Sequence, residues 1–137
     1  MAGTIIVGYD GLDGAKAALG RAIDLAKRLD AQLVVAYGYE VARIGGEVQD
    51  LAAALREMGE TLTEEAAEQA RASGLDPRTE VRDGEPASVL AALGTELGAE
   101  MIVVGTRGER PLVGAILGSL CHKLLHVAEV PVLVVPI

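Results

Sequence analysis

Short apolar runs alternate along the chain with longer segments in which apolar residues recur every three or four positions. The runs are rich in β-branched residues, as buried strands are, and the longer segments have the spacing of one helix face. The five predicted strands are Thr4–Tyr9, Leu33–Tyr37, Thr79–Arg82, Met101–Val104 and Pro131–Val135. The third of these is polar rather than apolar, as an edge strand would be. This alternation predicts an α/β fold in which a parallel sheet has helices on both faces and right-handed crossovers.

Four helices are predicted between the strands, within residues 13–29, 48–73, 85–97 and 119–127. We expect Asp13 to cap the first helix and Pro86 to stand in the first turn of the third. The predicted apolar face of the second helix consists of Val48, Leu51, Leu55, Met58 and Leu62. The preceding Gly45-Gly46 pair suggests a segment that moves over a ligand crevice. Residues 1–137 are expected to form one domain.

Composition and charge argue against several classes of function. The 137 residues carry a net charge of −8, and the only aromatic residues are Tyr9, Tyr37 and Tyr39. An acidic chain without a basic stripe is a poor candidate for binding nucleic acid or an anionic membrane. No apolar run is long enough to span a membrane, and the single cysteine, Cys121, excludes an internal disulfide. We therefore expect a soluble protein of the cytoplasm.

The most informative stretch follows the fourth predicted strand. Met101–Val104 leads directly into Gly105, and the pattern G-x2-G-x9-G-S then places glycines at 105, 108 and 118 and a serine at 119. Gly105 and Gly108 would let the backbone turn sharply and approach a ligand. Gly118 and Ser119 fall at a helix start, where unpaired N–H groups favour an anion. A phosphate group would fit there, although glycines also serve simple turns and caps.

Two further candidates lie at strand ends. Asp10 follows the first strand, where its carboxylate could accept hydrogen bonds from ribose hydroxyls or hold a magnesium ion bound to phosphates. It could also simply close a turn before Gly11. Tyr37 ends the second strand, where its ring or backbone could meet an adenine, or merely pack. In a doubly wound sheet, the carboxyl ends of the first and fourth strands line one crevice, so Asp10 and the glycine loop are expected to meet.

The glycine pattern resembles the nucleotide-binding signature of the universal stress protein family, and the resemblance covers essentially the whole chain. The opening 7–11 looks like the stretch whose aspartate approaches the ribose, and 33–37 looks like the strand that contacts adenine. The resemblance implies a Rossmann-like, adenine nucleotide α-hydrolase-like three-layer sandwich with strand order 3-2-1-4-5. The residues it places around the nucleotide are Gly8, Tyr9, Asp10, Tyr37, Val104, Gly105, Arg107, Gly108, Gly118, Ser119 and Leu120.

By this resemblance, the protein is an ATP-binding regulatory or stress-response module that works with ATP, with or without Mg²⁺. Some positions depart from the family pattern: Leu12, Ala15 and Cys121 stand where serine is frequent. Arg107 and Arg110 could neutralise phosphate charge or remain solvated. The closing strand resembles the one through which such proteins pair, so Val132–Val135 is expected to form a homodimer edge.

Catalysis has weaker support. No Walker lysine motif is present and no positioned base is identifiable, so ATP hydrolysis, if any, should be slow. His122 and His126 have metal-ligand spacing, but without an evident third ligand we expect them to face solvent or a partner. Cys121 is expected to be a buried, inert thiol rather than a nucleophile.

Three alternative interpretations remain, and two of them have sequence criteria. An enzyme cleaving ATP between its α and β phosphates would need a Ser-Gly-Gly-x-Asp-Ser loop, which is absent. A phosphoacceptor receiver domain would pair Asp10 with a neighbouring acid, and Tyr9 stands there instead; Asp83 alone does not supply that pocket. The remaining alternative is a dimeric interaction module of the same fold that binds no nucleotide.

Overall fold

The computed structural model describes residues 3–41, 48–106 and 117–137. The strands are β1 (Thr4–Gly8), β2 (Gln32–Tyr39), β3 (Arg78–Asp83), β4 (Met101–Gly105) and β5 (Val132–Val135). The helices are α1 (Asp13–Leu29), α2 (Val48–Ala72), α3 (Pro86–Leu97) and α4 (Ser119–Val127). The predicted alternation is confirmed, with boundaries shifted by one or two residues at most strands.

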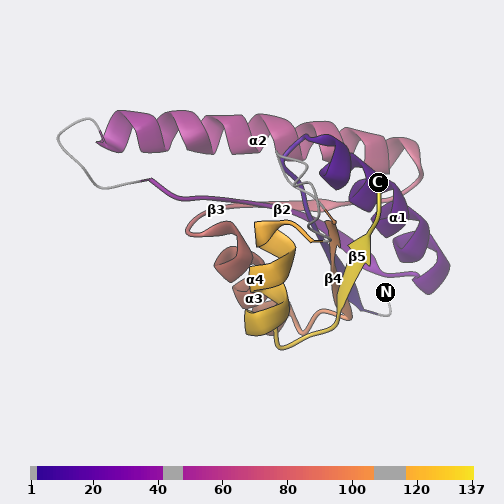
Figure 1. Cartoon of the computed structure of the whole chain (residues 1–137). Helices are drawn as coiled ribbons and strands as arrows, with labels where there is room; N and C mark the ends of the chain where they lie inside the picture. Colours follow the sequence, from indigo (N-terminus) through magenta and orange to yellow (C-terminus); the bar gives the residue numbers. More distant parts are fainter. Residues whose placement is uncertain (1–2, 42–47, 107–116) are drawn as a thin grey trace.

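The strands form one parallel sheet in the order β3-β2-β1-β4-β5, as the family resemblance implied. Helices α1 and α2 cover one face, and α3 and α4 cover the other, which gives three layers (Figure 1). The chain reverses its direction of winding between β1 and β4. The carboxyl ends of these two central strands therefore open onto one crevice.

The core lies on both faces of the central strands, because successive strand residues point to opposite sides. In β1, Ile5 and Val7 pack against α1 and α2, whereas Ile6 packs against α3. Alanines of α1 let this helix lie close to the sheet; Ala18, Ala22 and Ala26 are fully buried. The core is built mainly from aliphatic side chains, with Tyr9 as an aromatic member, and it packs β1 and β4 between the helices beneath the crevice.

Two local predictions were wrong. Leu51 and Met58 of α2 are more than half exposed, because the start of this helix projects beyond the sheet, as Figure 1 shows, and Met58 borders the open cleft. The buried residues of α2 come later, at Gly59, Thr63, Ala66, Ala67 and Ala70. Asp13 does not cap α1: Leu12 occupies the cap position and no side chain caps it. The predicted mobile Gly45-Gly46 segment lies outside the described residues.

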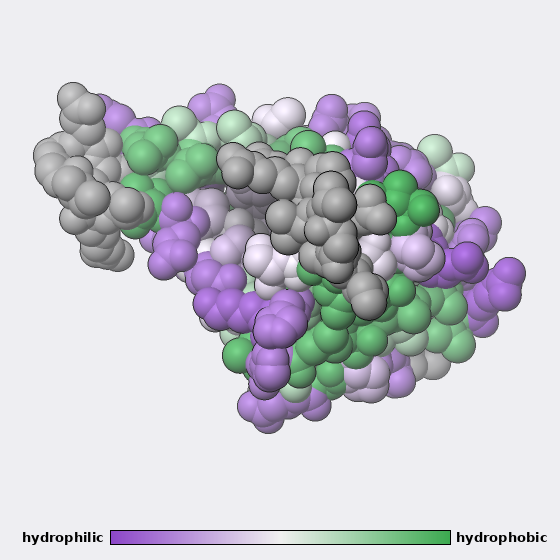
Figure 2. Space-filling view, viewed as in Figure 1, coloured by the Kyte–Doolittle hydropathy of each residue, from purple (hydrophilic) through white to green (hydrophobic). Residues whose placement is uncertain are grey.

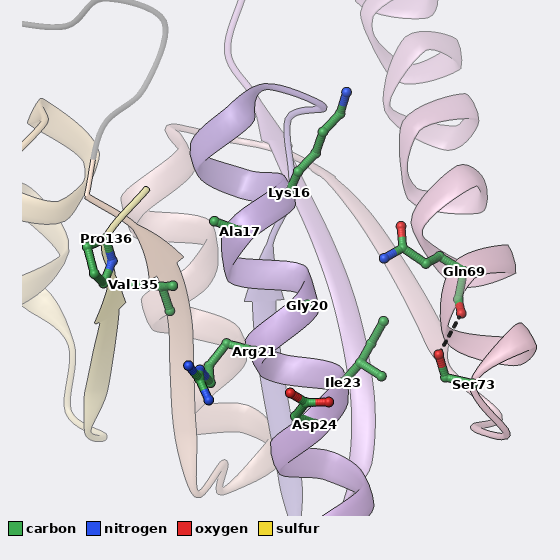
Figure 3. A pocket seen from close by; sticks show the side chains of 10 residues that line it. All are labelled: Lys16, Ala17, Gly20, Arg21, Ile23, Asp24, Gln69, Ser73, Val135 and Pro136. Carbon is green, nitrogen blue, oxygen red and sulfur yellow. Dashed lines mark hydrogen bonds between the residues drawn. The ribbon is translucent and has the colours of Figure 1, made fainter.

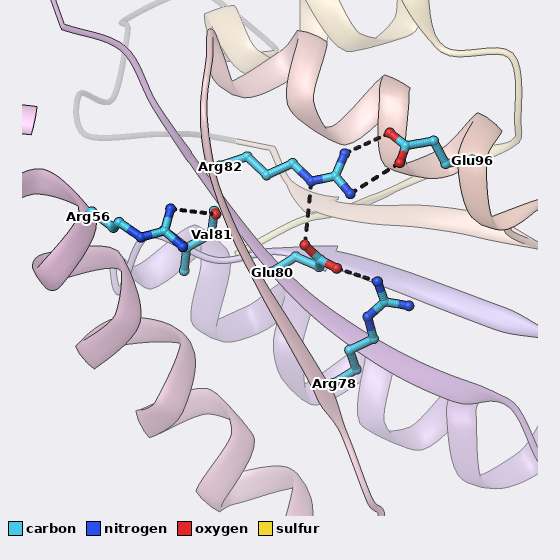
Figure 4. Close-up of polar contacts among 6 residues, drawn as sticks. All are labelled: Arg56, Arg78, Glu80, Val81, Arg82 and Glu96. Atoms are coloured by element: carbon cyan, nitrogen blue, oxygen red, sulfur yellow. Dashed lines mark hydrogen bonds and ion pairs between the residues drawn. The ribbon is translucent and has the colours of Figure 1, made fainter.

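The two edge strands of the sheet differ in chemistry. At β3, Glu80 pairs with Arg78 and Arg82, and Arg82 also binds Glu96 of α3 at 2.6 Å (Figure 4). Arg56 of α2 donates a hydrogen bond of 3.3 Å to the Val81 carbonyl (Figure 4). The β5 edge consists only of valine and leucine. Apolar side chains gather on the surface that β5 and α4 form (Figure 2).

Candidate functional site

A cleft of about 890 Å³ opens at the carboxyl ends of β1, β2 and β4. Its volume is within the usual range for small-molecule sites. Of the predicted nucleotide-binding residues, those that the structure describes all line this cleft: Gly8, Tyr9, Asp10, Tyr37, Val104, Gly105, Gly118, Ser119 and Leu120. Arg107 and Gly108 lie outside the described residues. The fold thus brings together segments that are more than a hundred residues apart in sequence.

Asp10 lies at the mouth of the cleft, in the loop between β1 and α1. One of its carboxylate oxygens accepts a hydrogen bond of 3.0 Å from the Leu12 N–H, so Asp10 does close a turn. Gly11 follows at φ +81°, a left-handed conformation that suits glycine. A side chain at Gly11 would also lie 2.7 Å from Leu62 of α2. The turn therefore holds the exposed carboxylate in place beside the cleft, where its second oxygen can meet a ligand.

Tyr37 forms part of the apolar end of the cleft and packs against α2. A Cβ on Gly59 would lie 2.5 Å from the Tyr37 ring, so the glycine admits the ring beneath the helix. The Tyr37 hydroxyl lies 3.9 Å from the Met58 sulfur. Pro86 and Leu90 of α3 line the opposite side. The wall at this end of the cleft is thus aliphatic and aromatic, and it suits the face of a planar base.

The two cleft tyrosines are neutral hydrogen-bond donors at physiological pH. Burial, followed by the negative charges of Glu65 and Asp10, raises the pKa of Tyr9. Burial and the charge of Asp10 likewise raise the pKa of Tyr37. The charge of Asp10 thus acts on both phenols, and all three residues line the same cleft. The sequence identified all three residues, although it did not indicate that they form one electrostatic group.

Gly105 is required by packing. An added Cβ would lie 2.4 Å from the Gly14 carbonyl oxygen of α1, too close for any side chain. The Gly105 carbonyl accepts a hydrogen bond of 2.7 Å from the Cys121 thiol, whose side chain is 1% exposed. Burial raises the pKa of this thiol, so it stays protonated and serves as a donor. The expectation that Cys121 is buried is confirmed, and its lack of reactivity stays a prediction; Gly105 lies against both α1 and α4.

Gly118 has a different role from Gly105. Its φ of −73° and ψ of 169° are open to any residue, so backbone conformation does not require glycine here. Gly118 is the N-cap of α4, and its N–H donates to the Thr106 carbonyl at 2.7 Å. As a glycine, Gly118 supplies no capping side chain. Among the described residues, no backbone acceptor outside the helix takes up the first amides of α4, beginning with Ser119, which lie at the polar end of the cleft, where the helix dipole favours an anion.

Several cleft residues were not among the sequence-predicted set. Met58 and Leu62 come from α2, Pro86 and Leu90 come from α3, and Thr106 follows β4. Their sequence signal was ambiguous, because apolar residues at helical spacing predict a core face equally well. Gly59 was a usable clue: a glycine inside a long helix indicates that something packs closely there.

Other candidates do not join the cleft. His122 and His126 are both exposed on α4, as expected. Asp83 is exposed at the end of β3 and lies outside the cleft lining. Across the described parts of the chain, no three His, Cys, Asp or Glu side chains are grouped so as to hold a metal ion. Within those parts, Asp10 therefore belongs to no group of three such ligands that could hold Mg²⁺.

A second hollow, of about 560 Å³, lies over the outer surface of α1 (Figure 3). Gly20 forms its floor, Gln69 and Ser73 of α2 border one side, and Val135 and Pro136 border the other (Figure 3). Lys16 and Arg21 point in different directions from α1. No set of polar groups converges on one point there, so the cleft at the strand ends remains the candidate site.

The sheet order and the cleft at the reversal of winding define a doubly wound α/β protein whose site lies at the carboxyl ends of its strands. The family model described as "Universal stress protein family" matches residues 1–136. The chain belongs to the universal stress protein family. In the parts of the chain that the structure describes, no helix is both long enough and apolar enough to cross a membrane.

Individual relatives agree with this assignment. A universal stress protein of Thermus aquaticus is 36% identical over 147 residues, covering 96% of this chain and 97% of the relative. Universal stress protein YxiE of Bacillus subtilis is 30% identical over 143 residues, with the same coverage of both chains. A solved universal stress protein in complex with cAMP is 28% identical and covers 98% of each chain, with a TM-score of 0.74.

Proposed function

We propose that the protein is an adenine-nucleotide-binding regulatory module and that ATP is its ligand. The observation that carries the proposal is the two-ended cleft, which has uncapped amides of α4 at one end and an apolar wall at the other. A nucleotide has the same polarity, with an anionic phosphate end and a planar base. The related protein crystallised with cAMP supports an adenine ligand in this family branch.

The proposed orientation follows from the chemistry of the lining. The base lies against Tyr37 and Pro86, where apolar surface is available. The ribose lies at Asp10, whose carboxylate can accept hydrogen bonds from its hydroxyls. The phosphates lie at the start of α4, where the Ser119 hydroxyl and backbone amides can donate to them. A Mg²⁺ ion would reach Asp10 as part of a phosphate complex, since Asp10 belongs to no three-ligand metal group among the described residues.

We expect this module to bind nucleotide and to turn it over slowly at most. The cleft lining contains no histidine, lysine or glutamate, and Asp10 is its only carboxylate among the described residues. The Cys121 thiol is already used as a donor to Gly105. A general base for water attack is thus not evident among them. The nucleotide would act as a regulatory ligand, and its output would pass to other proteins.

We also propose that the protein acts as a homodimer through Val132–Val135, in the cytoplasm. The all-apolar β5 edge and the exposed Leu125 and Val127 of neighbouring α4 support self-association. The same surface favours the second candidate function, a dimeric interaction module that binds no nucleotide. Nucleotide binding distinguishes the two functions, because both share the dimer.

The test compares Gly118→Ala with Gly20→Ala. A methyl group at 118 is compatible with the backbone conformation and would crowd the phosphate end, so the Kd for Mg-ATP should rise by roughly tenfold or more. Gly20 lies in α1 with open space around it, so its substitution should leave the Kd unchanged and raise Tm slightly. Isothermal titration calorimetry with ATP, AMP and cAMP measures the affinity for each nucleotide. The comparison shows whether the site prefers a triphosphate, a monophosphate or a cyclic phosphate.

The outcomes separate the candidates. Weakened ATP binding by Gly118→Ala alone would support the proposed site. Equal ATP binding by both variants would place the ligand elsewhere. No binding of any of the three nucleotides at millimolar concentration by the unmodified protein would contradict the nucleotide proposal and leave the interaction module.

A further inference from the structure

We propose that His122 and His126 form a two-imidazole binding site for Zn²⁺ on the exposed face of α4. The two residues are separated by four positions on one helix, a spacing that places both side chains on the same face. The same i, i+4 arrangement of histidines serves zinc on helices elsewhere. The site is separate from the nucleotide cleft, because neither histidine lines it.

The geometry of the pair fits a shared cation. The ring centroids are 4.9 Å apart, and the ring planes meet at 65°. Two imidazoles on one tetrahedral Zn²⁺, each at about 2.0–2.1 Å, place their ring centroids roughly 5 Å apart. The rings thus already have the separation that a common metal requires. Rotation about side-chain bonds of two exposed residues is enough to aim one nitrogen of each ring at the same point.

The electrostatic surroundings also favour a cation. His126 lies in the last turn of α4, where the negative end of the helix dipole stabilises positive charge. Lys123, the basic residue between the two histidines, forms an ion pair with Glu85 of α3 at 3.1 Å, so its charge is partly neutralised. The chain as a whole carries a net charge of −8. A divalent cation at this face therefore meets attraction at both short and long range.

The site is open on its outer side. No third His, Cys, Asp or Glu joins the pair among the described residues, so two coordination positions remain for water or for a donor from another molecule. Cys121 is the neighbour of His122 in sequence, but its thiol is buried and faces Gly105. The site is therefore a modest-affinity imidazole site and not a closed structural zinc centre.

The imidazole signals can be assigned without ambiguity, because the chain has only two histidines and both belong to the pair. Untagged, nucleotide-free protein is titrated with Zn²⁺, and the imidazole nitrogens are followed by NMR. Both histidines should shift together with one stoichiometric equivalent. His122→Gln and His126→Gln should each weaken binding by roughly tenfold or more, since either leaves a single metal–nitrogen bond.

A spacing control separates chelation from the mere presence of imidazole. In the variant His126→Gln with Val127→His, two histidines remain, but their side chains point to different sides of α4. This variant should bind as weakly as the single substitutions. The proposal would be overturned if it bound Zn²⁺ as tightly as the unmodified protein, or if the double substitution His122→Gln/His126→Gln left the affinity unchanged. Circular dichroism of each variant checks that the helix persists.

Discussion

The two edges of the sheet address the same physical problem in opposite ways. Any edge strand presents unpaired N–H and C=O groups that another strand can engage. At β3, alternate residues are charged and ion-paired, and Arg56 occupies the Val81 carbonyl. At β5, four apolar residues end the sheet. The difference indicates that β3 is protected against pairing, whereas β5 is suited to it.

The hydrogen-bond pattern shows which β5 residues would pair. The Pro131 and Val135 carbonyls accept hydrogen bonds from Ile102 and Thr106, on the β4 side. In a parallel ladder, the residues that bond to one side alternate with those that bond to the other. Val132 and Val134 therefore direct their backbone groups to the open edge, and Leu133 directs its groups to β4.

The largest expected effect comes from proline at β5. Val134→Pro removes an N–H that points to the open edge, so the β4–β5 ladder should survive while the dimer dissociation constant rises by roughly a hundredfold or more. Sedimentation velocity over a concentration series measures this change. The matched variant Leu133→Pro removes a ladder bond and should instead lower Tm clearly. A Val134→Pro protein that stayed dimeric at all concentrations would place the interface elsewhere.

A smaller effect is expected when the protection of β3 is removed. Replacing Arg78, Glu80 and Arg82 together by threonine keeps strand propensity and makes the net charge more negative, so general repulsion should increase. We nevertheless expect more self-association, seen as a roughly several-fold rise in light scattering on mild heating, because the edge is no longer charged. The double substitution Glu64→Thr/Arg71→Thr removes an exposed ion pair away from the edge and should leave scattering unchanged. Equal scattering in both variants would show that the charges do not protect the edge.

The smallest expected effect is the change in the stability of β3 at low pH. The hydrogen bond from Arg82 is the main cause that lowers the pKa of Glu96 below its ordinary 4.5. A lowered folded-state pKa stabilises the fold above pH 4.5, and this contribution is lost as pH falls through the folded-state pKa. Protection of β3 amides against hydrogen exchange should therefore decline below pH 4.5 relative to β5, which has no titratable residue. Glu96→Gln should flatten this difference; an unchanged pH profile would argue against the ion pair as its source.

The general architecture was predictable because its causes are local. Apolar runs identified four of the described strands and helical spacing the helices, β3 was recognised as a polar edge strand, and the strand order came from family resemblance. The apolar face of α2 was predicted correctly at Leu62, which packs against the core, and wrongly at Leu51, because periodicity cannot reveal where a helix extends beyond the sheet. Asp13 was mistaken for a cap because residue type alone does not determine where the first helical turn begins.

The candidate site was predictable where backbone chemistry leaves a mark in sequence. Asp10, Gly118 and Ser119 were found through strand ends and a helix start. Met58 and Pro86 were not found, because they reach the cleft only through tertiary packing. Gly105 was predicted as a place where the backbone turns and approaches a ligand. The structure adds a second reason, because the missing side chain lets α1 approach β4 at Gly14.

The contact between Gly105 and Gly14 has a consequence for how a ligand would be received. It joins the end of β4 to the start of α1, while the Cys121 thiol joins the same residue to α4. These two contacts hold the β1–α1 loop and the start of α4 at a fixed spacing across one end of the cleft. A ligand entering this part of the cleft loses its own freedom but needs to order little of the protein. Because the distance between the two sides of the cleft is fixed, we expect affinity to depend strongly on the length of the ligand.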